Sequence, residues 1–481
     1  MILSLLFDAT VHPYSRPLHL WSRRGIHLLV VVGLFGLFLA GSGNFFVAGL
    51  LTIALIALFA IVSNAKYKML GEPLLFSDLA LLAALFRHPR FYFTAISAEQ
   101  RIALMIAPFV LLIALAKLFV AHMTPHLIGV ALLLASLLLL VVGLGAMMRR
   151  GAACSPDAEA DVRRHGLIAT LLLYWLRWRA TSDPAPLPSL SACGSEPELV
   201  LVVQCESFAD PVELTGDASL SLAGLDAARG MAWQWGDLAV SGFGAYTMRT
   251  EYGVLFGRSE EALGFRRYDP FLTAHGETSY ALPARLRDCG YRSLFVHPHD
   301  MRFYGRDQLM PAIGFHQLVG LDSFPPVPAG NRYVDDGTLG NTLAGLADES
   351  AEPTLIYAVT MENHGPWSKD RLTGAPGGLG SYVRHLRSSD AMLSALIDRL
   401  RRTGRPALLV FFGDHRPSIP GVTEPGGPRH TPYVMLRFGA RGEILSGANR
   451  RVDLTPDALH HAILACIQDK AAGELVTPAK A

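Results

Sequence analysis

The chain has 481 residues with a formal net charge of +1, and hydrophobic residues make up 51% of it. This length is too great for one ordinary domain, and the balanced charge without a basic block gives no support to a nucleic-acid partner. The apolar excess lies in the first ~180 residues, whereas the remainder has the composition of a globular domain.

Four apolar stretches have about the length that a helix needs to cross a bilayer, roughly 20 residues. They cover residues 26–41, 44–64, 102–120 and 127–148. The shorter run 166–176 lies between pairs of arginines and predicts either a tilted fifth crossing or a helix in the membrane interface. Residues 73–86 are apolar but include Asp78, which indicates an interfacial or re-entrant helix.

Basic residues indicate how these helices are oriented. Arg23 and Arg24 precede the first span, Lys66 and Lys68 follow the second, and Arg149 follows the fourth. The loops after the first and third spans are nearly uncharged, so the positive-inside rule places the N-terminus in the cytoplasm. With five crossings, residues 1–180 form a transmembrane domain and the C-terminal domain lies outside.

The pattern changes beyond a linker rich in Pro and Ser, residues 181–197. Apolar runs that suit strands buried on both faces occur at 199–204, 293–296, 355–360 and 407–412. Between them, residues 279–288 and 379–402 have helical spacing. This alternation predicts an α/β domain over 198–475, with a mostly parallel central sheet between helices.

The five cysteines form no CxxC pair and show no zinc-finger spacing. Their odd number leaves at least one thiol outside any disulfide within the chain. We therefore expect isolated buried thiols and no disulfide framework.

Polar residues end two of the predicted strands. Glu206 follows the first, and Asp414 with His415 follows the last. Ligands of open α/β sheets gather at the carboxyl ends of strands, and carboxylate oxygens and imidazole nitrogens are ligands of divalent metals. Each residue alone would more often be a solvated or turn residue, but their similar positions favour a metal site.

A third chemical element is the glycine-rich segment 241–257. Gly242 and Gly244 permit a close approach of the backbone, and Thr247 begins a helical stretch. Free N–H groups at a helix N-terminus favour an anion such as phosphate, and a hydroxyl that touches a metal ionises more easily. An N-cap is the alternative role of Thr247.

Three further segments offer hydrogen-bond donors to a phosphate group. They contain His297 with His299, the stretch 302–306, and the stretch 363–367. Phosphoryl transfer depends mainly on positioning and on neutralising the charge of the phosphate oxygens. For each of these residues alone a solvated or structural role is the alternative. Trp367 is expected to pack, although beside His364 it could contact a sugar.

Together, these segments resemble the sulfatase/alkaline-phosphatase superfamily and, within it, the lipoteichoic acid synthase-like phosphoglycerol transferases. The motifs that carry the resemblance are VVQCESF from Val202, GFGAYTMRTEYGVLFG from Gly242, FVHP from Phe295 through FYGRD to IGF at Ile313, MENHGPW from Met361 and FFGDHRP from Phe411. The run GEPLLFSDL from Gly71 is similar to the membrane part of that family.

The resemblance implies a multi-span helical membrane domain joined to an alkaline-phosphatase/sulfatase-like α/β domain. It implies one divalent metal, most commonly Mn2+ with Mg2+ or Zn2+ as alternatives, held by Glu206, Thr247, Asp414 and His415. Thr247 would also be the nucleophile. The residues implied to bind the substrate are His297, Tyr304, Arg306, His364 and Trp367.

The activity implied by the resemblance is transfer of phosphoglycerol from phosphatidylglycerol to a periplasmic or cell-surface glycan through a covalent intermediate on Thr247. The protein would be integral to the lipid bilayer of a bacterial inner membrane, with its catalytic domain in the periplasm. Sulfate-ester hydrolysis is disfavoured, because Thr247 lacks a C/S-x-P-x-R motif and the Cys154 stretch ends in Ala158 where Arg is needed.

Three alternatives remain open from the sequence. One is a phosphoethanolamine transferase with the same threonine chemistry on zinc, although such relatives tend to be rich in disulfides. Another is a phosphoester hydrolase that passes the intermediate to water. The third is a non-catalytic membrane assembly protein on the same fold.

Overall fold

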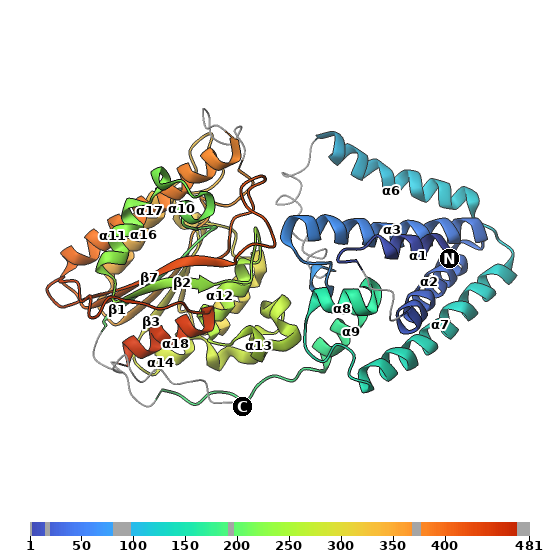
Figure 1. Cartoon of the computed structure of the whole chain (residues 1–481), viewed down its shortest axis with the longest axis horizontal. Helices are drawn as coiled ribbons and strands as arrows, with labels where there is room; N and C mark the ends of the chain where they lie inside the picture. The colour runs from blue at the N-terminus through green and yellow to red at the C-terminus, as the bar shows by residue number, and fades with distance from the viewer. Residues whose placement is uncertain (1, 15–19, 80–97, 191–196, 368–376, 469–481) are drawn as a thin grey trace. The chain divides into compact units, whose positions relative to one another are not determined.

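The computed structural model describes residues 2–14, 20–79, 98–190, 197–367 and 377–468. It divides into two compact units, Met1–Ser182 and Asp183–Ala481. Figure 1 shows the first unit as helical and the second as a sheet with helices.

The first unit consists of helices. They are α1 (Ile2–Ala9), α2 (Leu20–Ser42), α3 (Phe45–Leu70), α6 (Ala98–Leu118), α7 (Met123–Arg149), α8 (Ala158–His165) and α9 (Leu167–Ala180). In the part of the chain that the structure describes, three stretches are long and apolar enough to cross a membrane: Arg24–Ser42, Phe45–Leu70 and Met123–Arg149. The first, second and fourth predicted spans are therefore confirmed as long apolar helices.

The other two predicted crossings are less complete. The third coincides with α6, whose described apolar part, Pro108–Leu118, is shorter than a bilayer crossing. The fifth corresponds to α9, which has 14 residues and is ~21 Å long at 1.5 Å per residue. Membrane crossing by these two helices stays a prediction.

The predicted segment 73–86 lies partly outside the described residues, and in its described part Asp78 accepts hydrogen bonds from Lys66 Nζ and Leu75 N.

Small residues allow α2 and α7 to approach closely. A Cβ added at Gly36 would lie 2.7 Å from the carbonyl oxygen of Gly129, and one added at Gly129 would collide with the backbone of Ala40. In a bilayer, lipid tails are as apolar as leucine, so helices associate through close packing of this kind rather than through the hydrophobic effect.

The second unit is built on one eight-stranded sheet. Its strands are β1 (Leu199–Cys205), β2 (Gln234–Ala239), β3 (Arg292–Val296), β4 (Gln317–Val319), β5 (Thr354–Val359), β6 (Ala407–Gly413), β7 (His430–Phe438) and β8 (Arg450–Arg451). Their order is β4-β3-β5-β1-β6-β7-β2-β8. Only the pairs that β7 makes with β6 and β2 are antiparallel. The predicted mostly parallel sheet is confirmed.

Two groups of helices cover the faces of this sheet (Figure 1). One group contains α10 (Pro211–Thr215), α11 (Ala223–Met231), α16 (Asp336–Glu349) and α17 (Gly377–Thr403), and the other contains α12 (Thr247–Phe256), α14 (Leu282–Arg287), α15 (Arg306–Ala312) and α18 (Pro456–Ile467). The central strands β1, β5 and β6 are buried along their whole length, which explains their uninterrupted apolar sequences.

The cysteines differ from expectation. Cys289 is disulfide-bonded, whereas Cys154, Cys205 and Cys466 are free thiols. The expectation of buried thiols outside any disulfide is confirmed for Cys205 and Cys466 and is wrong for Cys154, which is exposed, and for Cys289. The spacing of the cysteines in the sequence gives no sign of this disulfide.

The α2–α7 contact can be tested with a single methyl group. Gly129→Ala should lower the thermal unfolding temperature of the full chain in detergent by several degrees, because overpacking a tight contact costs about 1–3 kcal/mol. Gly41→Ala is the matched control, since a Cβ there would meet nothing within 4 Å. Equal unfolding temperatures for both variants would show that the two helices do not pack as described.

Candidate functional site

Three side chains that could hold a metal ion meet where β1 and β6 end. These strands pair in parallel, with Cys205 opposite Gly413, so Glu206 and the Asp414–His415 pair emerge side by side. Their ligand atoms all lie within 4.8 Å of one another, and all three residues are buried. The predicted metal residues from two strand ends are thus brought together.

Hydrogen bonds fix the Asp414 carboxylate with one oxygen free. Oδ1 accepts hydrogen bonds from the backbone N–H groups of Ser207 (2.7 Å) and His415 (2.8 Å). Oδ2 is buried and has no hydrogen-bond partner among the described residues. A buried carboxylate oxygen without a partner is costly, and a bound cation would remove that cost.

The other two side chains fit the same cation. His415 Nδ1 faces the carbonyl of Arg416 at 3.3 Å, which leaves Nε2 directed at Glu206 Oε1 (3.2 Å) and Asp414 Oδ2 (3.7 Å). A ring held through its second nitrogen is the usual arrangement of a metal-binding histidine. Two carboxylates and one imidazole suit Mn2+, Mg2+ or Zn2+, so the donor set fits the metal that the sequence implied.

The pKa values of these three side chains differ from their ordinary values because the groups are buried next to one another. Burial raises the pKa of Asp414 to about 7, and the adjacent Glu206 carboxylate adds to the rise. Burial alone would lower the pKa of His415, but Asp414 and Glu206 outweigh it and raise that pKa to about 9. Burial opposes ionisation of Glu206, yet His364 and His415 lower its pKa to about 2.

Thr247 lies at this cluster. It is the first residue of α12 and is buried, and its side chain lies close enough to the Asp414 carboxylate to lower the pKa of that group. Thr250, one turn later, donates from Oγ1 to the backbone carbonyl of Asp414 at 2.6 Å. Tyr246, which precedes the helix, has φ 78°, a left-handed conformation that costs about 1–3 kcal/mol in a residue other than glycine. Strain of this kind, maintained next to the helix start, is common at functional sites.

Glycines make this placement possible. A Cβ at Gly242 would lie 2.8 Å from His415 Cβ, and one at Gly244 would lie 2.5 Å from Ser418 Cβ. Gly244 also donates its N–H to the carbonyl of Arg416 at 2.7 Å. The loop before Thr247 therefore lies directly against the segment after β6, as the predicted close backbone approach requires.

Arg306 and His297 form a second buried group. Arg306 donates from Nε to Glu251 Oε1 at 3.0 Å and pairs through Nη2 with Oε2, while its Nη1 faces His297 Nε2 at 3.3 Å. Because arginine can only donate, His297 Nε2 accepts and its Nδ1 carries the hydrogen that is donated to the Val359 carbonyl. Burial and then the Arg306 charge lower the pKa of His297 well below its ordinary value, so the ring is neutral.

His364 and Tyr304 also lie near the cluster. His364 is close enough to lower the pKa of Glu206. The Tyr304 ring lies under the Arg306 guanidinium at 5.2 Å and makes an edge contact with Phe271. Both side chains are half-buried and near the predicted site.

Trp367 lies on the core side of its loop. It packs edge-on against Tyr382 with ring centroids 5.0 Å apart, and its Nε1 donates to Asn363 Oδ1 at 3.1 Å. Tyr382 in turn donates to the carbonyl of Ser207 at 3.0 Å. These contacts give Trp367 a packing role behind the Glu206 loop, and its contact with a substrate stays a prediction.

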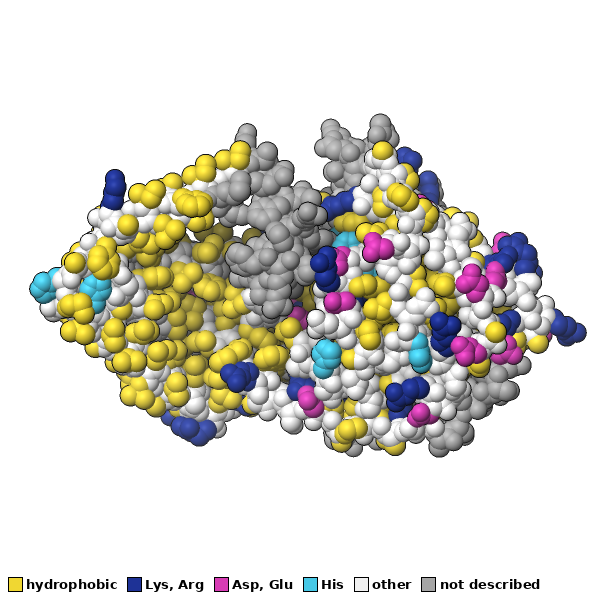
Figure 2. Space-filling model, turned by 180° about the vertical axis from the view of Figure 1, so that it is seen from behind, with side chains coloured by type: hydrophobic (Ala, Val, Ile, Leu, Met, Phe, Trp, Pro, Cys, Tyr) yellow, Lys and Arg dark blue, Asp and Glu magenta, His cyan; other side chains and the backbone are white. Residues whose placement is uncertain are grey.

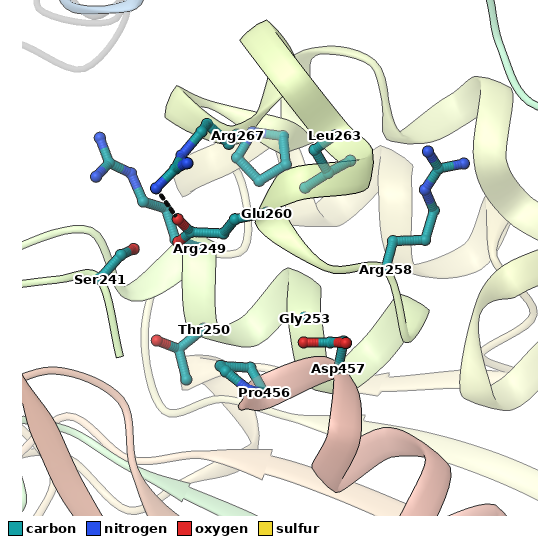
Figure 3. Close-up of a pocket in the computed structure, with 11 residues that line it drawn as sticks. Ser241, Arg249, Thr250, Gly253, Arg258, Glu260, Leu263, Arg267, Pro456 and Asp457 are labelled. Atoms are coloured by element: carbon teal, nitrogen blue, oxygen red, sulfur yellow. Dashed lines mark ion pairs between the residues drawn. The ribbon is translucent and has the colours of Figure 1, made fainter. Parts of the chain in front are cut away.

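A small pocket lies beside α12 (Figure 3). It is lined by Ser241, Arg249, Thr250, Gly253, Arg258, Glu260, Leu263, Arg267, Pro270, Pro456 and Asp457. Thr250, which donates to the carbonyl of Asp414, also lines this pocket, so the pocket adjoins the segment that carries Asp414 and His415. None of the predicted site residues lines it.

Sequence reasoning assigned no role to three residues that hold the site together. Ser207 binds both Asp414 Oδ1 and Glu206 Oε1, the Thr360 hydroxyl accepts from the Glu206 backbone N–H, and Glu251 fixes Arg306. Ser207 and Thr360 adjoin strand ends and Glu251 lies one turn after Thr247, which is the signal that could have singled them out.

The sequence is similar to a family model and to characterised bacterial proteins. The sequence model of the sulfatase family matches residues 198–464. The chain is 29% identical to the capsular polysaccharide biosynthesis protein RkpI of Rhizobium meliloti (strain 1021), over 89% of this chain and 84% of that protein. It is 22% identical to lipoteichoic acid synthase 1 of Bacillus subtilis (strain 168), over 40% of this chain and 34% of the relative.

Among solved structures, the integral membrane lipooligosaccharide phosphoethanolamine transferase A of Neisseria meningitidis is similar over 97% of this chain and 93% of its own. The TM-score is 0.57 and the sequence identity 13%. This likeness concerns the fold, and it extends over both the helical unit and the sheet unit. The match to the sulfatase family model over residues 198–464 confirms, at the level of the family, the resemblance that the sequence motifs indicated.

The metal cluster predicts a pH dependence. Ligands must lose their protons to bind a cation, and the pKa values of Asp414 and His415 lie at about 7 and about 9. The affinity for Mn2+ should therefore rise as the pH increases from about 6 to about 9, with protons released on binding. Isothermal titration calorimetry in two buffers of different ionisation enthalpy measures both effects. An affinity that does not change with pH would contradict this assignment.

The buried pair of Glu251 and Arg306 predicts a large effect on stability. Glu251→Gln keeps the size of the side chain but leaves the guanidinium buried beside a neutral amide, so we expect a loss of about 3 kcal/mol in the free energy of unfolding. Glu260→Gln is the matched control, because it removes a partly exposed pair with Arg267 worth about 0–1 kcal/mol. Denaturant unfolding of the two variants should differ clearly, and equal midpoints would refute the buried pair.

Proposed function

This chain belongs to the sulfatase family, and on that basis we propose that it is a membrane-anchored, metal-dependent transferase that moves phosphoglycerol from phosphatidylglycerol to a glycan. The proposal depends on one observation. Glu206, Asp414 and His415 form a buried cluster, and Thr247, at the start of α12, lies close enough to the Asp414 carboxylate to lower its pKa.

We propose that Glu206, Asp414, His415 and Thr247 hold one divalent ion, with Mn2+ as the expected metal. When bound, the ion neutralises charge on the phosphate and lowers the pKa of a coordinated hydroxyl. The residues of the chain then hold the nucleophile in place. Thr250 donates to the carbonyl of Asp414 and so fixes α12 against the end of β6, which holds Thr247 beside the Asp414 carboxylate.

The proposed reaction has two halves. Thr247 Oγ attacks the phosphorus of phosphatidylglycerol, and an Oγ–P bond forms as the bond to the diacylglycerol oxygen breaks. The proton lost by Thr247 is balanced by the proton that the leaving diacylglycerol oxygen gains. The oxygen of a glycan hydroxyl then attacks the same phosphorus, a new P–O bond forms as the Oγ–P bond breaks, and the proton of that hydroxyl returns to Thr247 Oγ. The product is a glycan that carries phosphoglycerol.

The residues proposed to bind the donor are His297, Tyr304, Arg306, His364 and Trp367. Of these, His364 and Tyr304 are half-buried near Glu206, which supports direct contact with the donor. Arg306 is fully buried and is held by Glu251 through Nε and Nη2, and its Nη1 faces His297 Nε2. Trp367 would influence the donor site indirectly, because it packs against Tyr382, which donates a hydrogen bond to the carbonyl of Ser207.

The names of relatives support the substrate class. RkpI is described as a capsular polysaccharide biosynthesis protein, and it aligns with most of this chain, which supports a glycan acceptor. The match to lipoteichoic acid synthase 1 supports a phosphoglycerol donor. The whole-chain likeness to a phosphoethanolamine transferase makes phosphatidylethanolamine the competing donor.

We propose that the catalytic unit lies in the periplasm of a bacterium whose inner membrane holds the helical unit. The disulfide at Cys289 supports this location, because structural disulfides persist in the oxidising periplasm and are rare in the cytosol. The charge distribution around the apolar helices supports the same orientation.

The covalent intermediate provides the decisive test. The purified chain incubated with phosphatidylglycerol and Mn2+, without glycan, should gain the mass of one phosphoglycerol group on the peptide that contains Thr247. Thr247→Ala should lower transfer at least a thousandfold, because it removes the nucleophile.

Thr431→Ala serves as a control, since this buried threonine hydroxyl donates to the Gly413 carbonyl. Full transfer activity in Thr247→Ala would rule out the threonine mechanism. A phosphoethanolamine adduct from phosphatidylethanolamine, in place of phosphoglycerol, would change the donor but keep the nucleophile.

A further inference from the structure

The residues that lead into the sheet unit are bound along its surface. We name residues 183–190 the strap. Tyr280 donates from its hydroxyl to the carbonyl of Ala185 at 2.8 Å, and the N–H of Leu187 donates to Ser279 Oγ at 3.0 Å. Arg285 donates to the carbonyl of Pro188. Hydrogen bonds at three points along its length make the strap part of the folded unit, although its composition is that of a linker.

The strap ends at a buried ion cluster. Asp183 Oδ1 lies 2.8 Å from Arg266 Nη1, and the same nitrogen lies 3.1 Å from Glu277 Oε1. Glu277 Oε2 also pairs with Arg258 Nε at 3.0 Å. Glu277 is fully buried and Arg266 nearly so, whereas Asp183 is half-exposed. The cluster therefore reaches from the surface into the core.

A charge count shows what Asp183 contributes. Arg258, Arg266 and Glu277 together carry one net positive charge, and Asp183 brings the sum to zero. An excess charge on a buried guanidinium is poorly solvated and alters the geometry of its neighbours. Asp183 thus offsets the net positive charge of these three side chains.

The cluster also holds the helix of the nucleophile. Tyr252, fully buried on α12, donates from its hydroxyl to Glu277 Oε2 at 2.6 Å and stacks on Phe256 with ring centroids 4.2 Å apart. Arg258 directly follows the glycine that ends α12, and Figure 3 shows it at the edge of the pocket beside this helix. Two members of the cluster therefore fix α12, at whose other end lies Thr247.

Gly276 leaves the space that the Asp183 carboxylate occupies. A Cβ added at Gly276 would collide with the Asp183 carboxylate. The absence of a side chain at the residue before Glu277 lets the strap lie close enough for Asp183 to reach Arg266.

We propose that Asp183 is a positioning residue: it completes the buried cluster of Arg258, Arg266 and Glu277, which orients α12 and so aligns Thr247. The functional sulfatase-like domain accordingly begins at Asp183 and includes the strap. The kinetic part of this inference rests on the proposed transferase function.

The test uses the full chain in detergent with Asp183→Asn, Asp183→Glu and the control Asp348→Asn. The control removes a partly exposed pair with Arg399 on the other face of the sheet. A small misplacement of a nucleophile costs about tenfold or more in rate. We expect Asp183→Asn to lower kcat about tenfold at a temperature where the fold is intact, with KM for phosphatidylglycerol unchanged, and Asp183→Glu to restore most of the rate.

A double-mutant cycle tests the route through the cluster. Because Asp183 is proposed to act through Glu277 and Tyr252, Asp183→Asn should have a smaller effect in a Tyr252→Phe background than in the unchanged chain. Rates that are unchanged by Asp183→Asn, rates lowered equally by Asp348→Asn, or fully additive effects in the cycle would each overturn the proposal.

The Mn2+ affinity of the same variants separates this inference from the proposed function, because it does not require the donor. Should the unchanged chain show no phosphoglycerol transfer, the proposed function fails. Weaker Mn2+ binding in Asp183→Asn, restored in Asp183→Glu, would still support the positioning role, and equal binding in all variants would refute it.

Discussion

The site depends on the way one residue, Asp414, joins three parts of the chain through its carboxylate and its backbone carbonyl. Its Oδ1 accepts N–H groups from Ser207 after β1 and from His415 after β6, and its backbone carbonyl accepts the hydroxyl of Thr250 on α12. Every one of these bonds is buried, where hydrogen bonds to a charged group are strongest and loss of a partner is most costly. These contacts of Asp414 determine where the start of α12, and so Thr247, lies relative to the ends of β1 and β6.

The short helix α12 contacts several buried charged groups at once. Thr247 and Glu251 are four residues apart and lie on the same face, where one meets Asp414 and the other holds Arg306. Tyr252 points to a third partner, Glu277. All ten residues of α12 are buried, so a shift of the whole helix would disturb the contacts that Glu251 and Tyr252 make with charged side chains.

The two units are stabilised by different physics. In the sheet unit, apolar strands and covering helices form a continuous core, into which paired charges are placed at the strand ends. In the helical unit many large apolar side chains are exposed, as expected for helices that face lipid, and Figure 2 shows broad hydrophobic surface on that unit. There, close backbone approach at glycines replaces hydrophobic burial as the source of helix association.

The sequence by itself determined the three long apolar helices, the four buried strands and the residues at their ends, because apolar periodicity and length act locally. It also placed Glu206 and Asp414 together, since adjacent parallel strands end at one edge. Only the tertiary structure decided the antiparallel strand β7, the Cys289 disulfide, the Glu251–Arg306 pair and the docking of the strap. These arise from contacts between residues far apart in the chain, and such contacts depend on burial and distance, which leave no periodic signal in a single sequence.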